Sequence, residues 1–414
     1  MAVAEALRSV PSGERPFRRR LTDALLLMLA VGLACSITLS ELTLLTLFVV
    51  LLAGARPGAA WLRAPLATPL LAFAGWTLIS AAMAMQPGDS LRASKGLLTL
   101  ATFWIVLAAL PDAAAARRFA TIVFVTVSAV GLLSIVQVAG CVHGAWQNAP
   151  RLPLVDTYFN KCARAHGFFS IYMTLAGVLT VVLILTLPRL GGFARAGVAA
   201  VAWVGGAVAL GLTLVRGAWF GFAVGAGVTL VLARRRVLAL GLLVIVIAAA
   251  LALPAVHERL QTIGNPADDT TRDRLAMLKG GLRLVREHPV SGIGPGQVKH
   301  LYPVYAPADA LRRHTSHLHD TPLQIVVERG VVGLALWLWI FVAFFVRTGR
   351  ILRRVPASAT ADRALVIGAV AAVAAFLVAG LFEYNFGDTE VLLVTLAAMA
   401  LPFVVERDLA ERTA

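Results

Sequence analysis

The residues best suited to chemistry lie in one polar segment, which runs from Pro254 to Asp320 and holds six of the eight histidines. It ends in a cluster of three histidines and an aspartate: His314, His317, His319 and Asp320. A histidine of this kind can act as a general base, because a neutral imidazole takes a proton from a hydroxyl within reach. The alternative is a set of surface histidines without a role.

The same cluster could bind zinc in principle, since imidazoles and carboxylates are zinc ligands. Its spacing, H-x-x-H-x-H, matches none of the common zinc motifs. The adjacent Arg312 and Arg313 would also repel a cation. We therefore expect no metal and no other cofactor.

A second candidate is Arg216. The apolar stretch from Ala196 to Leu232 is too long for a single membrane span, so it must fold back on itself. Arg216-Gly217 is the polar break in it, which places Arg216 at the mouth of a helical hairpin. A guanidinium held there is a good donor to a phosphate. The alternative is an arginine that snorkels to lipid headgroups beside the interfacial Trp219.

A third candidate is a basic segment between Thr271 and Arg286, in which apolar residues recur at helical spacing. These residues are Leu275, Leu278, Leu282 and Val285. The pattern predicts an amphipathic helix on or over the membrane, whose arginines, Arg274 among them, either bind an anion or face solvent and headgroups. The following string, Gly292–Gly296, predicts a turn and not a phosphate loop, because it lacks a preceding strand and a Gly-Lys-Ser/Thr ending.

The remainder of the chain must position these residues, and it is strongly apolar. Of 414 residues, 59% are hydrophobic and 14% charged, whereas a soluble domain has about 45–50% apolar and about 25% charged residues. Because lipid cannot satisfy backbone polar groups, the spans must be helices. The sequence predicts an all-α polytopic membrane protein with about twelve transmembrane helices. The predicted spans are 22–37, 40–55, 66–84, 93–111, 119–141, 167–187, 196–214, 217–233, 236–253, 325–346, 364–382 and 389–405.

Three parts follow from this pattern. Residues 1–253 form transmembrane helices 1–9, residues 254–324 form one large, partly helical loop, and residues 325–414 form helices 10–12. The short basic loops all fall on one side of the membrane, which marks that side, and both termini, as cytoplasmic. The large loop is then extracytoplasmic.

Cations also gather on the opposite side, which should be poor in them. Sixteen of the 37 arginines and lysines fall outside the cytoplasm. An anionic substrate such as a phosphate accounts for this excess, although long loops also escape the charge rule. The loop rule and the membrane helices together argue against a nucleic-acid partner. On the same side, Cys141 and Cys162 flank a short loop and could form a disulfide in an oxidising compartment.

Three segments resemble the O-antigen ligase and polymerase superfamily of bacterial surface-polysaccharide assembly. They are Thr213–Trp219, Arg274–Gly296, and His317–Asp320 followed by Leu323-Gln324, Glu328-Arg329-Gly330 and Gly333. The resemblance extends from about Arg164 to Gly333. Two positions depart from it: Asp320 stands where an amide or serine is usual, and Leu278 where an aromatic residue is frequent.

The resemblance implies a glycosyltransferase. It would transfer O-antigen polysaccharide from undecaprenyl pyrophosphate to the lipid A–core oligosaccharide at the periplasmic surface, without a metal and with inversion at the sugar carbon. It further implies that His319 is the base and that Arg216 and Arg274 bind the pyrophosphate. Additional carrier or acceptor contacts are expected from Lys95, Lys161, Arg164, His317 and Asp320.

Two alternatives stay open. An O-antigen polymerase would use the same chemistry with another acceptor, but polymerases tend to carry two sizeable periplasmic loops, whereas this chain has one. A transporter of lipid-linked sugars would also explain many spans and periplasmic cations. Transporters usually need charged groups inside the spans, and most spans here are nearly free of them.

Overall fold

The computed structural model describes residues 16–54, 64–142, 164–233, 241, 244, 248, 269–308 and 310–413. Within these ranges the chain is helical and contains no strand. Of the described helices, seven are long and apolar enough to cross a membrane, and three shorter ones are also apolar. The predicted all-α membrane architecture is therefore confirmed.

Eleven of the predicted spans coincide with described helices, and span 236–253 lies outside the described residues apart from three isolated positions. The number twelve stays a prediction. The helices that lie in or next to these spans are α2 (Pro16–Cys35), α3 (Ile37–Leu52), α4 (Ala67–Ala82), α5 (Pro87–Ala93), η1 (Ser94–Leu100), α6 (Ala101–Ala109), α7 (Ala113–Val142), α9 (Tyr172–Thr186), η2 (Leu187–Gly192), α10 (Ala196–Leu212), α11 (Arg216–Ala233), α16 (Thr321–Arg354), α17 (Thr360–Ala379) and α18 (Thr389–Thr413).

Helix α17 lies in the interior of the bundle, against α9, α11 and α18. Its contact with α11 is close because glycines line the facing side of α11. A Cβ atom added to Gly221 would lie 2.5 Å from the Ala375 carbonyl oxygen, and one on Gly225 would lie 2.8 Å from the Ala375 methyl carbon. Small residues at such spacing let membrane helices approach and gain van der Waals contact.

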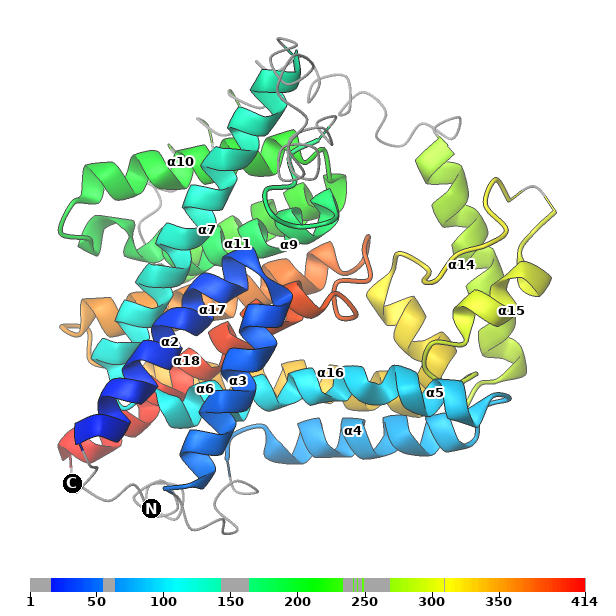
Figure 1. The fold of residues 1–414 in the computed structure, drawn as a ribbon, viewed down its shortest axis with the longest axis horizontal. Coiled ribbons are helices and arrows are strands. Elements are labelled where there is room, and N and C mark those ends of the chain that lie inside the picture. Colours follow the sequence, from blue (N-terminus) through cyan, green and yellow to red (C-terminus); the bar gives the residue numbers. More distant parts are fainter. Residues whose placement is uncertain are drawn as a thin grey trace.

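The polar segment forms two further helices, α14 (Asp269–Glu287) and α15 (Val298–Tyr305), at one side of the bundle. Helices α4 and α16 run toward them, whereas the start of α2 and the end of α18 lie on the opposite side (Figure 1). The start of α2 and the end of α18 are thus on the same side of the molecule.

Helix α14 confirms the predicted amphipathic helix, but another face of it packs against the protein. Leu275, Leu278 and Leu282 are 50%, 40% and 45% exposed. The packed face carries Gly280 and Gly281 instead, whose missing side chains admit the neighbouring α15 and α16. A leucine periodicity alone therefore identified the helix and not its contact surface.

Helix α16 is broken at Gly330, which has a φ of 67° and ψ of −175°. The break frees backbone groups that the glycine turn satisfies. Ile293 and Gly294 donate their N–H groups to the carbonyls of Val327 and Glu328, both at 2.9 Å, and Val331 donates to the carbonyl of Pro289 at 2.8 Å. These bonds attach the glycine turn to α16 near its N-terminal end.

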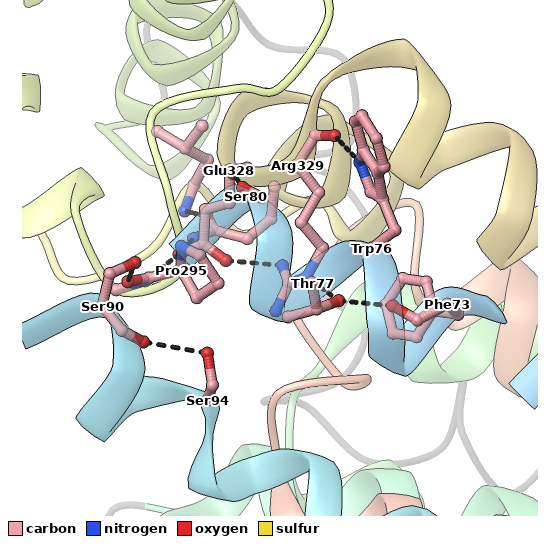
Figure 2. Close-up of polar contacts among 12 residues, drawn as sticks. Phe73, Trp76, Thr77, Ser80, Ser90, Ser94, Pro295, Glu328 and Arg329 are labelled. Carbon is pink, nitrogen blue, oxygen red and sulfur yellow. Dashed lines mark hydrogen bonds and ion pairs between the residues drawn. The ribbon is translucent and has the colours of Figure 1, made fainter. Parts of the chain in front are cut away.

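Helix α4 completes this junction from the other side (Figure 2). Trp76 donates its indole N–H to the Arg329 carbonyl at 2.8 Å, and the Ser80 hydroxyl lies 2.9 Å from the Glu328 carbonyl oxygen. The side chains of Glu328 and Arg329 form a buried ion pair, 2.7 Å between Oε2 and Nη1. Because each buried charge has its partner, the pair avoids the cost of an isolated ion.

The α11–α17 contact gives a stability prediction. Gly221→Ala should lower the thermal unfolding midpoint in detergent, because overpacking costs about 1–3 kcal/mol. The matched control is Gly227→Ala on the same helix, where an added Cβ meets no atom within 4 Å. We expect that control to unfold at or above the wild-type midpoint. Equal destabilisation by both changes would show that helix contact is not the cause.

Candidate active site

His319 lies in the turn that leads into α16, and its backbone places the ring. Its φ is 50°, in the left-handed region, where non-glycine residues are uncommon and where strain is often found at functional sites. The preceding Leu318 is buried, and its N–H donates to Gln324 Oε1 at 2.8 Å. The following Asp320 caps α16 by accepting a hydrogen bond from the Leu323 N–H at 2.8 Å. The ring is thereby fixed from both sides.

The partner of His319 comes from the loop between α17 and α18. His319 Nδ1 lies 2.9 Å from Glu383 Oε2. Thr321 ties the two loops together, because its N–H donates to the Gly380 carbonyl at 2.7 Å and its hydroxyl to the Glu383 carbonyl at 2.8 Å. The histidine and the carboxylate are thus positioned by different spans through a shared contact.

Glu383 also forms an ion pair with Arg274 of α14 through its other carboxylate oxygen. A carboxylate only accepts hydrogen bonds, so the proton of a neutral His319 ring lies on Nδ1. Nε2 then carries the lone pair and is the atom that can take a proton. The arrangement is that of a general base oriented by a carboxylate.

These residues line a cavity of about 180 Å³ that is rich in arginine. Its lining residues are Arg164, Tyr172, Met173, Leu214, Val215, Arg216, Asp269, Thr270, Asp273, Arg274, Met277, Arg312, His319 and Glu383. The structure therefore brings His319, Arg216, Arg274 and Arg164 together, although they come from four parts of the chain. Such a concentration of guanidinium groups favours an anionic ligand with several oxygens.

Each arginine is placed by its own local structure. Arg216 begins α11, immediately after the turn that ends α10. Arg164 lies over the ring of Tyr172, 4.3 Å from its centroid, which holds the guanidinium by a cation–π contact. Arg312 is paired with Asp273, 3.1 Å between Nε and Oδ2.

A second cavity, of about 390 Å³, adjoins the first at Glu383. Glu383 and Met173 line both cavities, whereas His317 lines only the second. The rings of His317 and His319 are 4.4 Å apart between centroids. Burial, and secondarily the neighbouring His319, lower the pKa of His317 to about 4, so its ring is neutral at pH 7. Burial likewise raises the pKa of Tyr384, in the wall of this cavity, to about 12.

The other predicted contacts are placed differently. Lys95 is exposed on η1 and does not line either cavity. The Asp320 carboxylate faces the α16 N-terminus, so Glu383, and not Asp320, is the carboxylate hydrogen-bonded to His319. Lys161 and Cys162 lie outside the described residues, whereas Cys141 is disulfide-bonded. In the part of the chain that the structure describes, no three histidine, cysteine or acidic side chains are grouped as metal ligands.

Glu383 and Arg312 are two charged lining residues that sequence reasoning missed. Glu383 is 64 residues from His319 along the chain, so only the packing of α17 beside α16 brings them together. A signal was present, since Glu383 is one of the few acids in a short loop between apolar spans. Arg312 was considered only as a charge that repels a metal.

The fold and this cavity define a class: a polytopic membrane protein with an arginine-rich site and an oriented histidine at one end of its helix bundle. Residues 199–338 match the family model for O-antigen ligase. The matched stretch includes Arg216, Arg274 and His319, whereas Arg164 and Glu383 lie outside it. Over this stretch, about a third of its length, the chain is similar to the O-antigen ligase family. No curated protein matches the chain.

The lowered pKa of His317 gives a prediction on pH. Between the unfolded value of 6.5 and the folded value of about 4, the unfolded chain binds a proton that the folded protein does not. The free energy of unfolding should therefore fall as pH drops through this window. We expect His317→Gln to lose less thermal stability than wild type between pH 6.5 and 4. The control is His314→Gln at an exposed position, which should follow wild type; a His317→Gln curve parallel to wild type would contradict the assignment.

Proposed function

We propose that this chain is a membrane glycosyltransferase that transfers O-antigen polysaccharide from undecaprenyl pyrophosphate to the lipid A–core oligosaccharide at the periplasmic face of the inner membrane. The observation that carries the proposal is the Arg274–Glu383–His319 chain in an arginine-lined cavity. It combines, in one place, a base for a hydroxyl and cations for a leaving pyrophosphate. The family match supports the same class of reaction.

The reaction follows from these groups. Nε2 of His319 takes the proton of the acceptor hydroxyl as its oxygen attacks the first carbon of the donor sugar. The bond from that carbon to the pyrophosphate oxygen breaks, and the electron pair leaves with the lipid pyrophosphate. Direct displacement inverts the configuration at this carbon.

The surrounding charges match the charges that develop. Arg216 and Arg274 neutralise the pyrophosphate as its bridging oxygen becomes an anion. Glu383 stabilises the imidazolium that His319 becomes and keeps the reactive lone pair on Nε2. Arg164 adds a further cation to the same cavity.

The acceptor distinguishes a ligase from a polymerase, since the displacement is the same for both. We favour the ligase because the sequence has one large periplasmic loop. The basic short loops support a topology in which both termini face the cytoplasm, and the large loop and the cavity face the periplasm.

Complementation tests the proposal. The chain would be expressed in a Gram-negative strain that lacks its ligase but makes a compatible carrier-linked O-antigen. Wild type should restore a lipopolysaccharide ladder on a gel, and His319→Ala, at equal membrane abundance, should abolish it because the base is lost. His314→Ala serves as the matched control, since His314 does not line either cavity. A ladder that persists in His319→Ala would exclude this histidine as the base.

If wild type gives no ladder while the glycan accumulates on its carrier, the ligase assignment fails for that pair of substrates. The same chain would then be tested in a strain that lacks its O-antigen polymerase. Restoration of long O-antigen chains in that strain would show that the protein is a polymerase and not a ligase.

The role of Glu383 gives a separate prediction. Glu383→Gln should lower kcat by a factor between about 10² and 10⁴, because an amide can donate to Nδ1 and select the wrong tautomer. The measurement is the transfer rate of the purified enzyme at saturating acceptor. Glu287→Gln on α14 is the control, since this glutamate is bonded to Tyr305 and does not line either cavity. Equal rates for Glu383→Gln and wild type would remove Glu383 from the mechanism.

A further inference from the structure

The second cavity has the chemistry of a sugar site. One part of its wall is apolar and aromatic, with Leu97, Leu100 and Phe386. Another part is polar, with His317 and Tyr384. A sugar ring has apolar faces and a polar edge, so it suits a wall of both kinds better than an isoprenoid chain does. The volume of about 390 Å³ lies within the range of small-molecule sites, about 300–1,000 Å³.

The polar part of this wall is rigid because most of its groups are already bonded within the protein. Glu328 accepts hydrogen bonds from the Gly296 N–H and from Gln324 Nε2, both at 2.8 Å, in addition to its pair with Arg329. Asp388 accepts from the Thr174 hydroxyl at 2.6 Å. These residues shape the cavity and have little capacity left for a ligand.

Two side chains do have capacity for a ligand. The Tyr384 hydroxyl is hydrogen-bonded to Arg329, and since a guanidinium only donates, the tyrosine O–H is left to donate elsewhere. His317 Nδ1 lies 3.0 Å from the Ser316 hydroxyl, which fixes the ring and leaves Nε2 for another partner. A hydroxyl-bearing ligand can bind to both.

The position of the cavity indicates which sugar it takes. In a displacement with inversion, the attacking oxygen and the leaving oxygen lie on opposite sides of the reacting carbon. The arginines that suit the leaving pyrophosphate line the first cavity, and Glu383 and Met173 line both cavities. His319 lines the first cavity and His317 the second, and their ring centroids are 4.4 Å apart with an angle of 58° between the ring planes.

We propose that the second cavity binds the terminal sugar of the acceptor and presents its hydroxyl to His319, with Tyr384 and His317 as specificity-determining contacts. This inference rests on the proposed glycosyl transfer and adds to it the place of the acceptor. The donor sugar remains next to the pyrophosphate, on the arginine side of Glu383.

A cavity-filling variant tests the inference. Gly96 lines the second cavity, and an added Cβ there meets no atom within 4 Å. Gly96→Trp should therefore add a large side chain at the wall of the acceptor space, with no contact at its Cβ atom that forces the backbone to shift. The matched control is Gly88→Trp on the adjacent α5, which also meets no atom within 4 Å but does not line the cavity.

The assay uses the full-length enzyme in lipid nanodiscs with undecaprenyl-pyrophosphate-linked glycan as donor and lipid A–core as acceptor. Gly96→Trp should raise the acceptor KM about tenfold or more, because sterically excluded contacts are lost, while the donor KM stays at the wild-type value. The slow release of glycan to water, which needs no acceptor sugar, should persist. Gly88→Trp should behave as wild type in all three measurements.

A second variant keeps the inference testable if Gly96→Trp does not fold. Tyr384→Phe removes one hydroxyl and should raise the acceptor KM about tenfold, the loss expected when one hydrogen bond is removed, again without a change in donor KM. A wild type that transfers nothing overturns the proposed function and the inference with it. An active wild type whose variants raise the donor KM, or leave both constants unchanged, overturns the inference alone.

Discussion

The break of helix α16 at Gly330 is the constraint on which the rest of the site depends. A membrane helix that is interrupted has backbone groups that must find partners, because lipid supplies none. Here the partners come from the glycine turn and from α4, through bonds such as Ile293 N–H to the Val327 carbonyl and Trp76 to the Arg329 carbonyl. The same bonds hold the polar segment to the bundle, so the segment that begins α16 also fixes the turn that carries His319.

From that anchored turn, one carboxylate organises the charges. Glu383 faces a histidine with one oxygen and an arginine with the other. An anionic ligand in the cavity competes with Glu383 for Arg274. Weakening that ion pair leaves the carboxylate more able to stabilise a protonated His319. The cation that meets the ligand and the base that receives the proton are therefore linked through a single side chain.

Much of this could be predicted from the sequence, for identifiable reasons. Long apolar runs can only be helices in lipid, and the excess length of Ala196–Leu232 required a hairpin at Arg216. The spacing of Leu275, Leu278 and Leu282 identified α14 as a helix. These are local properties, since each depends on residues within a few turns of one another.

What could not be predicted depends on tertiary contact. The pair of His319 and Glu383 forms only because α16 and α17 pack together, and no local pattern encodes it. The packed face of α14 was missed because it carries Met277, Gly280, Gly281 and Leu284 and not the leucines of the periodic pattern. Asp320 next to His319 in sequence is a helix cap, which shows that adjacency along the chain does not ensure contact between side chains.

The glycines of the turn and of the break in α16 also limit which substitutions the sequence can accept. Gly292, Gly294, Gly296 and Gly330 all have positive φ values, and a Cβ atom on any of them would meet a neighbour at less than 3 Å. The neighbours of Gly292 and Gly330 are backbone atoms, so changes in side chains cannot relieve a substitution there. Gly294 and Gly296 meet side-chain atoms first, and their positive φ values are the restriction that remains. Leucines on the exposed face of α14 carry no such restriction. In related sequences, substitutions should therefore be frequent on that face of α14. The four glycines should be replaced only where the conformation of the loop also changes.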